Sequence, residues 1–146
     1  MIKIDHLIYY ILQLTWGILQ NIAGFLVCAF LLIKDPKRPR FRFKGSFVTL
    51  WDSPYSAGIG MFIFLGRTRP EYFMPVLVHE YGHTIQSCIL GPLYFFVIGL
   101  PSYIWAHRRK YAENRTRGLY RYSDFYPERW ANHLGRIFTG MKPIDY

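Results

Sequence analysis

The residues best suited to chemistry are His79, Glu80 and His83, within the stretch HEYGH. On an α-helix, His79 and His83 lie one turn apart on the same face. Two imidazoles placed in this way can bind one zinc ion, at Zn–N distances near ~2.1 Å. Glu80 then projects beside the metal, where its carboxylate can take a proton from a zinc-activated water. The stretch therefore predicts a zinc site with Glu80 as the catalytic base.

The same spacing also occurs by chance in helices that bind no metal. Here the surrounding segment PVLVHEYGHTIQSCIL is largely apolar. Ionisable side chains in such a setting are costly unless they are paired or bind a metal. A metal ion removes that cost, so we favour a metal site over a purely structural role for the two histidines.

A catalytic zinc ion needs a third protein ligand and one open coordination position. We choose Glu128, because it opens a predicted helix over residues 124–138 and has Asn132 one turn later on the same face. The other acidic or histidine side chains considered as ligands are His107, Asp124, His133 and Asp145. The expected ligand set is therefore His79, His83 and Glu128.

Neighbouring polar side chains are expected to support these ligands. Asn132 can hydrogen-bond a ligand histidine and so fix its tautomer. Gln86 lies near the motif face, and we expect it to hydrogen-bond across helices. The alternative role for Glu128 is a solvated surface carboxylate paired with Arg129 or Arg121.

The pair of motifs HEYGH and ERWAN resembles the gluzincin zinc metallopeptidases, where a later helix supplies a Glu to a His-Glu-x-x-His helix. Asn132 stands where an Asp is common in that family. Asn can also accept a hydrogen bond from the imidazole, but it lacks the negative charge of Asp, so the ligand histidine would be less basic. The short chain and its apolar runs are similar to the integral-membrane minigluzincins. The resemblance covers residues 41–136 at most. It implies a minimal zincin-like catalytic core with one zinc ion per chain.

Two further roles remain to be assigned. Transition-state stabilisation usually needs a hydrogen-bond donor besides zinc. We select Tyr122 or Tyr126 from the donors near Glu128, which also include Tyr120, Arg129 and His133. The resemblance also implies that GIGMFIFLG, residues 58–66, forms a strand whose edge pairs with an extended substrate. A strand that only covers the site is the alternative.

Long apolar segments must position these residues. Residues 7–33 carry no charge and are long enough to cross a bilayer. A signal peptide fits less well, because no small-residue cleavage site follows. We expect a mainly α membrane protein with one domain over residues 1–146. Its predicted elements are transmembrane helices at 7–33, 75–90 and 92–107, a β-hairpin at 45–66 and a helix at 124–138.

Polar and small residues inside the first apolar segment form one stripe on a helix. They recur at steps of three and four, as Gln13, Gly17, Gln20, Asn21 and Gly24. Amides that face lipid are costly. We therefore expect the stripe to face other helices.

The basic residues are clustered. Of 18 Lys and Arg residues, 8 lie in 34–69 and 9 in 107–146, which leaves only Lys3 at the N-terminus. The positive-inside rule then predicts an N-terminus outside and an active site at the cytosolic face. No nucleic-acid-binding motif accompanies the net charge of +9, so we expect contact with lipid rather than with nucleic acid.

The sequence thus predicts a zinc-dependent membrane metalloendopeptidase, a hydrolase that cleaves peptide bonds of a peptide or protein substrate. The alternative is a non-catalytic, chaperone-like membrane protein with a structural or relic zinc site. An autoinhibited peptidase, plugged by its own tail KPIDY, is a variant of the first reading. The sequence leaves the oligomeric state and the substrate open.

Overall fold

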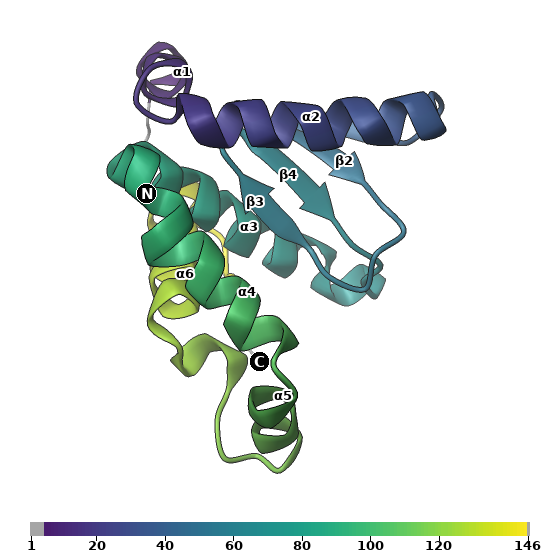
Figure 1. Ribbon diagram of the computed structural model, residues 1–146, viewed down its shortest axis with the longest axis vertical. Helices are drawn as coiled ribbons and strands as arrows, with labels where there is room; N and C mark the ends of the chain where they lie inside the picture. Colours follow the sequence, from purple (N-terminus) through teal and green to yellow (C-terminus); the bar gives the residue numbers. More distant parts are fainter. Residues whose placement is uncertain (1–4, 146) are drawn as a thin grey trace.

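The computed structural model describes residues 5–145, which combine helices with a small mixed sheet (Figure 1). The helices are α1 (His6–Leu14), α2 (Ile18–Lys34), α3 (Pro70–Leu90), α4 (Leu100–His107), α5 (Arg109–Thr116) and α6 (Tyr126–Thr139). The strands are β1 (Arg40–Phe43), β2 (Ser46–Leu50), β3 (Ala57–Ile59) and β4 (Phe62–Leu65). Shorter helical segments are the 3₁₀ turns Gly91–Leu93 and Tyr122–Asp124 and the π-helix Phe95–Gly99.

The sheet has the strand order β1-β2-β4-β3. β2 and β4 run parallel, with Val48 opposite Ile63, whereas the other two pairs are antiparallel. The predicted hairpin over residues 45–66 is therefore wrong. The segment that follows β2 does not make a tight turn. It leads to β3, which lies at the edge of the sheet and is separated from β2 by β4. The chain then returns through a tight turn into β4.

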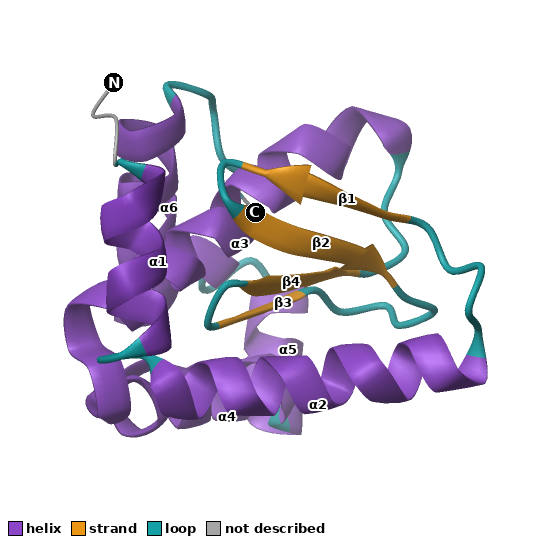
Figure 2. Cartoon of the chain, turned by 90° about the horizontal axis from the view of Figure 1, so that it is seen from above, coloured by secondary structure: helices purple, strands orange, loops and turns teal. Residues whose placement is uncertain are grey.

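The two faces of the sheet pack against different helices, so that Figure 2 shows the strands between α2 and α3. Phe62 points to α2, where its ring contacts Phe25 at a centroid distance of 6.5 Å. Val48 and Ile63 point the other way and join the core around Tyr81 of α3. The alternation of side chains along each strand produces this division.

α3 is the central element of the fold. Every residue from Val76 to Cys88 is buried, including the polar ones. The helix begins at Pro70, which suits a first helical position because proline lacks a backbone N–H. The predicted start at Pro75 was therefore too late, and the motif HEYGH lies in the middle of the helix.

The prediction of three transmembrane helices is wrong. Among residues 5–145, no single helix is long and apolar enough to cross a membrane. The segment 7–33 is divided into α1 and α2, which differ in direction by 91°. The segment 92–107 is divided as well, and its helical part from Phe95 to His107 bends by 118° away from α3. Each bent pair has the length and apolar composition of a membrane span only when its two helices are taken together.

Local hydrogen bonds and backbone geometry explain both bends. At the first, the Asn21 side-chain amide donates to the carbonyl oxygens of Gln13 and Gly17, which stabilises the break between α1 and α2. At the second, Gly91 has φ of 51°, a left-handed conformation that favours glycine. A Cβ at Gly91 would also overlap the indole ring of Trp16. The two bends therefore pack directly against each other.

Candidate metal centre

α3 supplies three ionisable side chains to one buried site. His79, Glu80 and His83 are each at most 6% exposed. The rings of His79 and His83 lie one helical turn apart, with centroids 4.8 Å apart and planes at 90°. Both Nε2 atoms are thereby directed to the same point in space.

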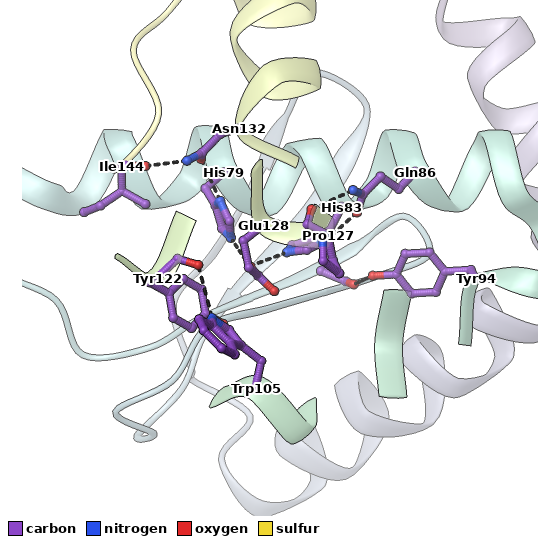
Figure 3. A network of polar contacts seen from close by, with 11 residues as sticks. His79, His83, Gln86, Tyr94, Trp105, Tyr122, Pro127, Glu128, Asn132 and Ile144 are labelled. Atoms are coloured by element: carbon purple, nitrogen blue, oxygen red, sulfur yellow. Dashed lines mark hydrogen bonds and ion pairs between the residues drawn. The ribbon is translucent and has the colours of Figure 1, made fainter. Parts of the chain in front are cut away.

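α6 brings Glu128 to this point (Figure 3). Its Oε2 lies 3.1 Å from Nε2 of His79 and 3.4 Å from Nε2 of His83. The alternative of a solvated surface carboxylate is excluded, because Glu128 is 1% exposed. The three side chains form the group among residues 5–145 that could hold a metal ion, with ligand atoms within 4.8 Å of one another.

Two glycines allow α6 to approach α3 this closely. A Cβ at Gly82 would overlap the backbone carbonyl of Ala131, and one at Gly135 would overlap that of Val78. Only glycine permits such close contact between the backbones of two helices, because it has no Cβ. The position of Glu128 relative to the histidines is therefore set by main-chain packing.

Asn132 fixes the orientation of His79, as the sequence predicted. Its Oδ1 lies 2.8 Å from Nδ1 of His79, while its Nδ2 donates to the carbonyl oxygen of Ile144 at 2.8 Å. Because Nδ2 is committed to Ile144, Oδ1 must accept a proton from His79 Nδ1. In the neutral imidazole of His79, the lone pair is then on Nε2, which faces the site.

Gln86 has the same effect on His83. Its Oε1 lies 2.7 Å from Nδ1 of His83, and its Nε2 donates to the carbonyl oxygen of Pro127 at 2.8 Å. This bond to the start of α6 is the contact between helices that the sequence led us to expect. The orientation of His83 is an additional role that the spacing alone did not indicate.

The charges of the site favour a cation. Burial alone would lower the pKa of His79, but the carboxylates of Glu128 and Glu80 outweigh it and raise that pKa. Burial raises the pKa of Glu80. Oε1 of Glu128 and Oε2 of Glu80 have no hydrogen-bond partner, and Oε2 of Glu128 contacts the Nε2 atoms of the two histidines. Unpartnered buried carboxylate oxygens beside two imidazole nitrogens fit a metal ion, which would satisfy them.

The site opens into a cavity of about 1090 Å³. Its floor includes His79, Glu80, His83 and Glu128, and its walls are mainly apolar or aromatic. Residues on these walls include Trp51, Ile59, Val76, Tyr94, Ile98 and Tyr122. The candidate ligands therefore face the cavity.

The tyrosines differ in their relation to the site. Tyr122 lines the cavity, with its ring 6.4 Å from that of His79. Tyr126 does not line it, because its hydroxyl donates to the carbonyl oxygen of Val97 at the surface. Sequence reasoning missed Tyr94, which was assigned to a membrane helix. Tyr94 is buried in the cavity wall, and its hydroxyl donates to the carbonyl oxygen of Gly58 at 2.7 Å.

The segment GIGMFIFLG is not one strand. It forms the end of β3 and all of β4, and only β3 lies at the sheet edge. Gly58 of β3 lies directly over α3, since a Cβ there would be 2.6 Å from the Glu80 carbonyl oxygen. The carbonyl oxygen of Gly58 already accepts the bond from Tyr94. An extended peptide that pairs with β3 at Gly58 would have to displace Tyr94.

A functional interpretation of this chain rests on the geometry of the site, because comparisons with other proteins found no match. The chain matches no model of a protein family, and neither the characterised proteins nor the solved structures include a match. The resemblance to gluzincins therefore rests on the short motifs and on the site that they form.

Proposed function

We propose that this chain is a zinc-dependent metalloendopeptidase in which His79, His83 and Glu128 bind zinc. The main support is the convergence of three buried ligand atoms within 4.8 Å of one another. Two imidazoles and one carboxylate form the ligand set of catalytic zinc in several peptidases, where an open position remains for the substrate. Glu80 lines the same cavity and is not needed as a ligand.

Each residue of the site has a distinct task in this proposal. Zinc supplies a Lewis acid that polarises a carbonyl group and acidifies water. Glu80 accepts a proton on its unpartnered Oε2 and transfers it to the leaving amine. Asn132 and Gln86 hold the two imidazole rings with Nε2 directed inwards.

The cavity fits a peptide with apolar side chains. Its volume of about 1090 Å³ compares with ~300–1,000 Å³ for typical ligand sites. Trp51, Ile59 and Ile98 supply apolar walls. Among the hydroxyl groups of the wall, we assign transition-state stabilisation to Tyr122, whose ring lies 6.4 Å from that of His79.

A self-inhibited form of the same enzyme is a second candidate, favoured by the position of Ile144. This tail residue is buried, lines the cavity, and donates its backbone N–H to the carbonyl oxygen of Pro75 at 3.0 Å. Replacing Ile144 by Gly would enlarge the cavity beside His79. Faster cleavage of large substrates by this variant would favour self-inhibition, whereas slower cleavage would assign the tail a structural role.

The decisive experiment compares Glu80→Gln with Glu113→Gln. Glu113 is an exposed residue of α5, so its substitution controls for loss of a carboxylate. We expect about one zinc per chain in all three proteins, with peptide cleavage lost only in Glu80→Gln. The loss should be at least ~100-fold, as expected for removal of a general base. Wild-type protein without stoichiometric zinc would contradict the metal assignment. Zinc-loaded protein that cleaves no peptide would favour a non-catalytic protein with a structural or relic zinc site.

A further inference from the structure

The outer surface of the two bent helix pairs consists almost entirely of apolar side chains. Between residues 7 and 33, Thr15 is the single exposed polar residue, and its hydroxyl donates to the Ile11 carbonyl oxygen. We define the apolar corner surface by the exposed apolar residues within 7–33 and 89–104, the parts of the two pairs nearest the bends. They are Leu7, Ile8, Ile11, Leu14, Trp16, Ile18, Leu19, Ile22, Phe25, Leu26, Phe30, Ile33, Ile89, Pro92, Leu93, Phe96, Leu100, Tyr103 and Ile104.

The amides of the same helices point the other way. Gln13, Gln20 and Asn21 are at most 4% exposed. Asn21 binds the backbone N–H of Met61 at 2.8 Å, and Gln13 donates to the carbonyl oxygen of Thr84 at 3.0 Å. Helices that face water show the opposite arrangement, with polar groups outside and apolar groups inside. The outer surface is therefore adapted to an apolar solvent.

The surface is continuous across the point where the two bends meet. The Trp16 indole N–H donates to the carbonyl oxygen of Ile89 at 3.4 Å, and the Gln20 amide donates to that of Gly91. Figures 1 and 2 show α1, α2 and α4 leaving this region in three different directions. Leu14, Trp16, Ile89 and Leu93 thus lie at a corner from which three apolar arms diverge.

Charges lie at the far ends of the arms and not at the corner. α2 ends in Lys34 and continues into a segment with six basic residues and one acidic residue over 34–44. The arm that contains α4 continues into Arg108, Arg109 and Lys110. Cationic side chains at this position complement the anionic headgroups of a bilayer. Large contiguous apolar surfaces are rare on soluble monomers and mark sites of contact with a membrane or another protein.

We propose that the corner inserts into an anionic lipid bilayer, with the corner residues deepest and the basic ends of the arms among the headgroups. This arrangement needs no helix to cross the bilayer. It places both basic segments on the same side of the membrane as the sheet, because all arms return from the inserted corner. Lipid binding in this form is independent of the metal and of peptide cleavage.

Vesicle flotation with matched variants tests whether the apolar corner surface binds an anionic lipid bilayer. Leu26 is 61% exposed within the apolar corner surface, and Leu119 is 63% exposed outside it, near α5. We expect the full-length protein to float with phosphatidylcholine vesicles that contain phosphatidylglycerol, and less well with phosphatidylcholine alone. Leu26→Glu should reduce the vesicle-bound to free ratio about tenfold or more, whereas Leu119→Glu should leave it unchanged.

The proposal is overturned if the protein does not float, or if the two Glu variants lose binding equally. It is also overturned if lipid-free, detergent-free protein forms a soluble dimer that Leu26→Glu dissociates, since a second copy would then cover the surface. Metal-free protein should float as well as zinc-loaded protein. Failure of the peptidase assay therefore leaves this test intact.

Depth-dependent quenching tests the orientation. Trp16 lies at the corner, so lipids brominated deep in the acyl chain should quench its fluorescence more than lipids brominated near the headgroup. The Trp16→Phe variant identifies the part of the signal that comes from this residue among the four tryptophans. Stronger quenching of Trp16 by the shallow bromines would rule out insertion with the corner deepest.

Discussion

Two apolar regions that look alike in the sequence have opposite environments in the structure. Residues 76–88 of α3 are buried on every side, and their polar side chains form the candidate metal site. The helices α1 and α2 are covered only on their polar side and expose their apolar side. Apolar content alone therefore does not distinguish a core helix from one that faces lipid. The placement of the few polar residues does.

Replacing Gly82 by Ala should have the largest effect on the buried region. The new Cβ would overlap the Ala131 carbonyl oxygen, so α6 would have to move away from α3. We expect a loss of about 3 kcal/mol or more in the free energy of unfolding, together with weaker zinc binding. Denaturant titration in detergent measures the first and competition with a chelator the second.

Gly99→Ala is the matched control, because the nearest atom to its Cβ would be 3.5 Å away, an ordinary contact. It should change the stability by less than about 1 kcal/mol. Equal losses in Gly82→Ala and Gly99→Ala would contradict the close contact between α3 and α6.

Removing the support of His79 should weaken metal binding without unfolding the protein. In Asn132→Ala, the imidazole of His79 loses the acceptor for its Nδ1 proton. We expect zinc affinity to fall ~10–100-fold. Asn132→Asp keeps an acceptor and adds charge, so it should bind zinc more tightly than Asn132→Ala does. If the Ala and Asp variants bind zinc equally well, Asn132 does not position His79.

Exchanging polar and apolar residues within α1 tests its two sides directly. Gln13→Leu removes the donor to Thr84 and the acceptor of the Asn21 amide, so it should cost about 1–3 kcal/mol of stability. Leu14→Gln lies on the exposed side and breaks no internal hydrogen bond, so it should cost less stability in detergent than Gln13→Leu. Unfolding curves of both variants make the comparison. The interpretation is wrong if Leu14→Gln is the more destabilising of the two.

Cysteine labelling tests the burial of α3, and its expected effect on the fold is the smallest of these experiments. Burial raises the pKa of the Cys88 thiol to about 12. At pH 8 this thiol stays protonated, and only the thiolate reacts rapidly with alkylating reagents. In Cys28→Ser, iodoacetamide should therefore label the native protein very slowly and the unfolded protein readily. Rapid labelling of native Cys28→Ser would show that α3 is more open than described.

The site could be predicted more fully than the fold that holds it. His79, His83 and Glu128 were named from the sequence, because the i,i+4 spacing and helix start are local patterns. The bond between Asn132 and His79 is confirmed for the same reason. Tyr94 was missed because its role depends on β3, and no local pattern links it to Gly58.

The errors in the fold come from contacts between distant segments. β2 and β4 pair in parallel because the chain between them first forms β3 at the edge of the sheet. The hydrophobic pattern of a strand does not predict this, since it is the same for either direction of pairing. The bend between α1 and α2 depends on hydrogen bonds of Asn21 and on packing against Gly91. The polar stripe of the first apolar segment was predicted to face other helices. It is buried, but only Gln13 and Gln20 bond to α3 and the turn after it, whereas Asn21 and Gly24 face β3, β4 and the turn between them.

The hydrogen bond between Asn132 and Ile144 gives the extended segment 141–145 an effect on distant chemistry. A carboxamide has two nearly identical ends, one that offers a proton and one that takes one. The main-chain oxygen of Ile144 distinguishes them, since it can only pair with the NH₂ end. Without residues 141–145, the Asn132 amide could turn over and offer His79 a proton instead. The tautomer of that imidazole is thus decided by a peptide group 65 positions further along the chain.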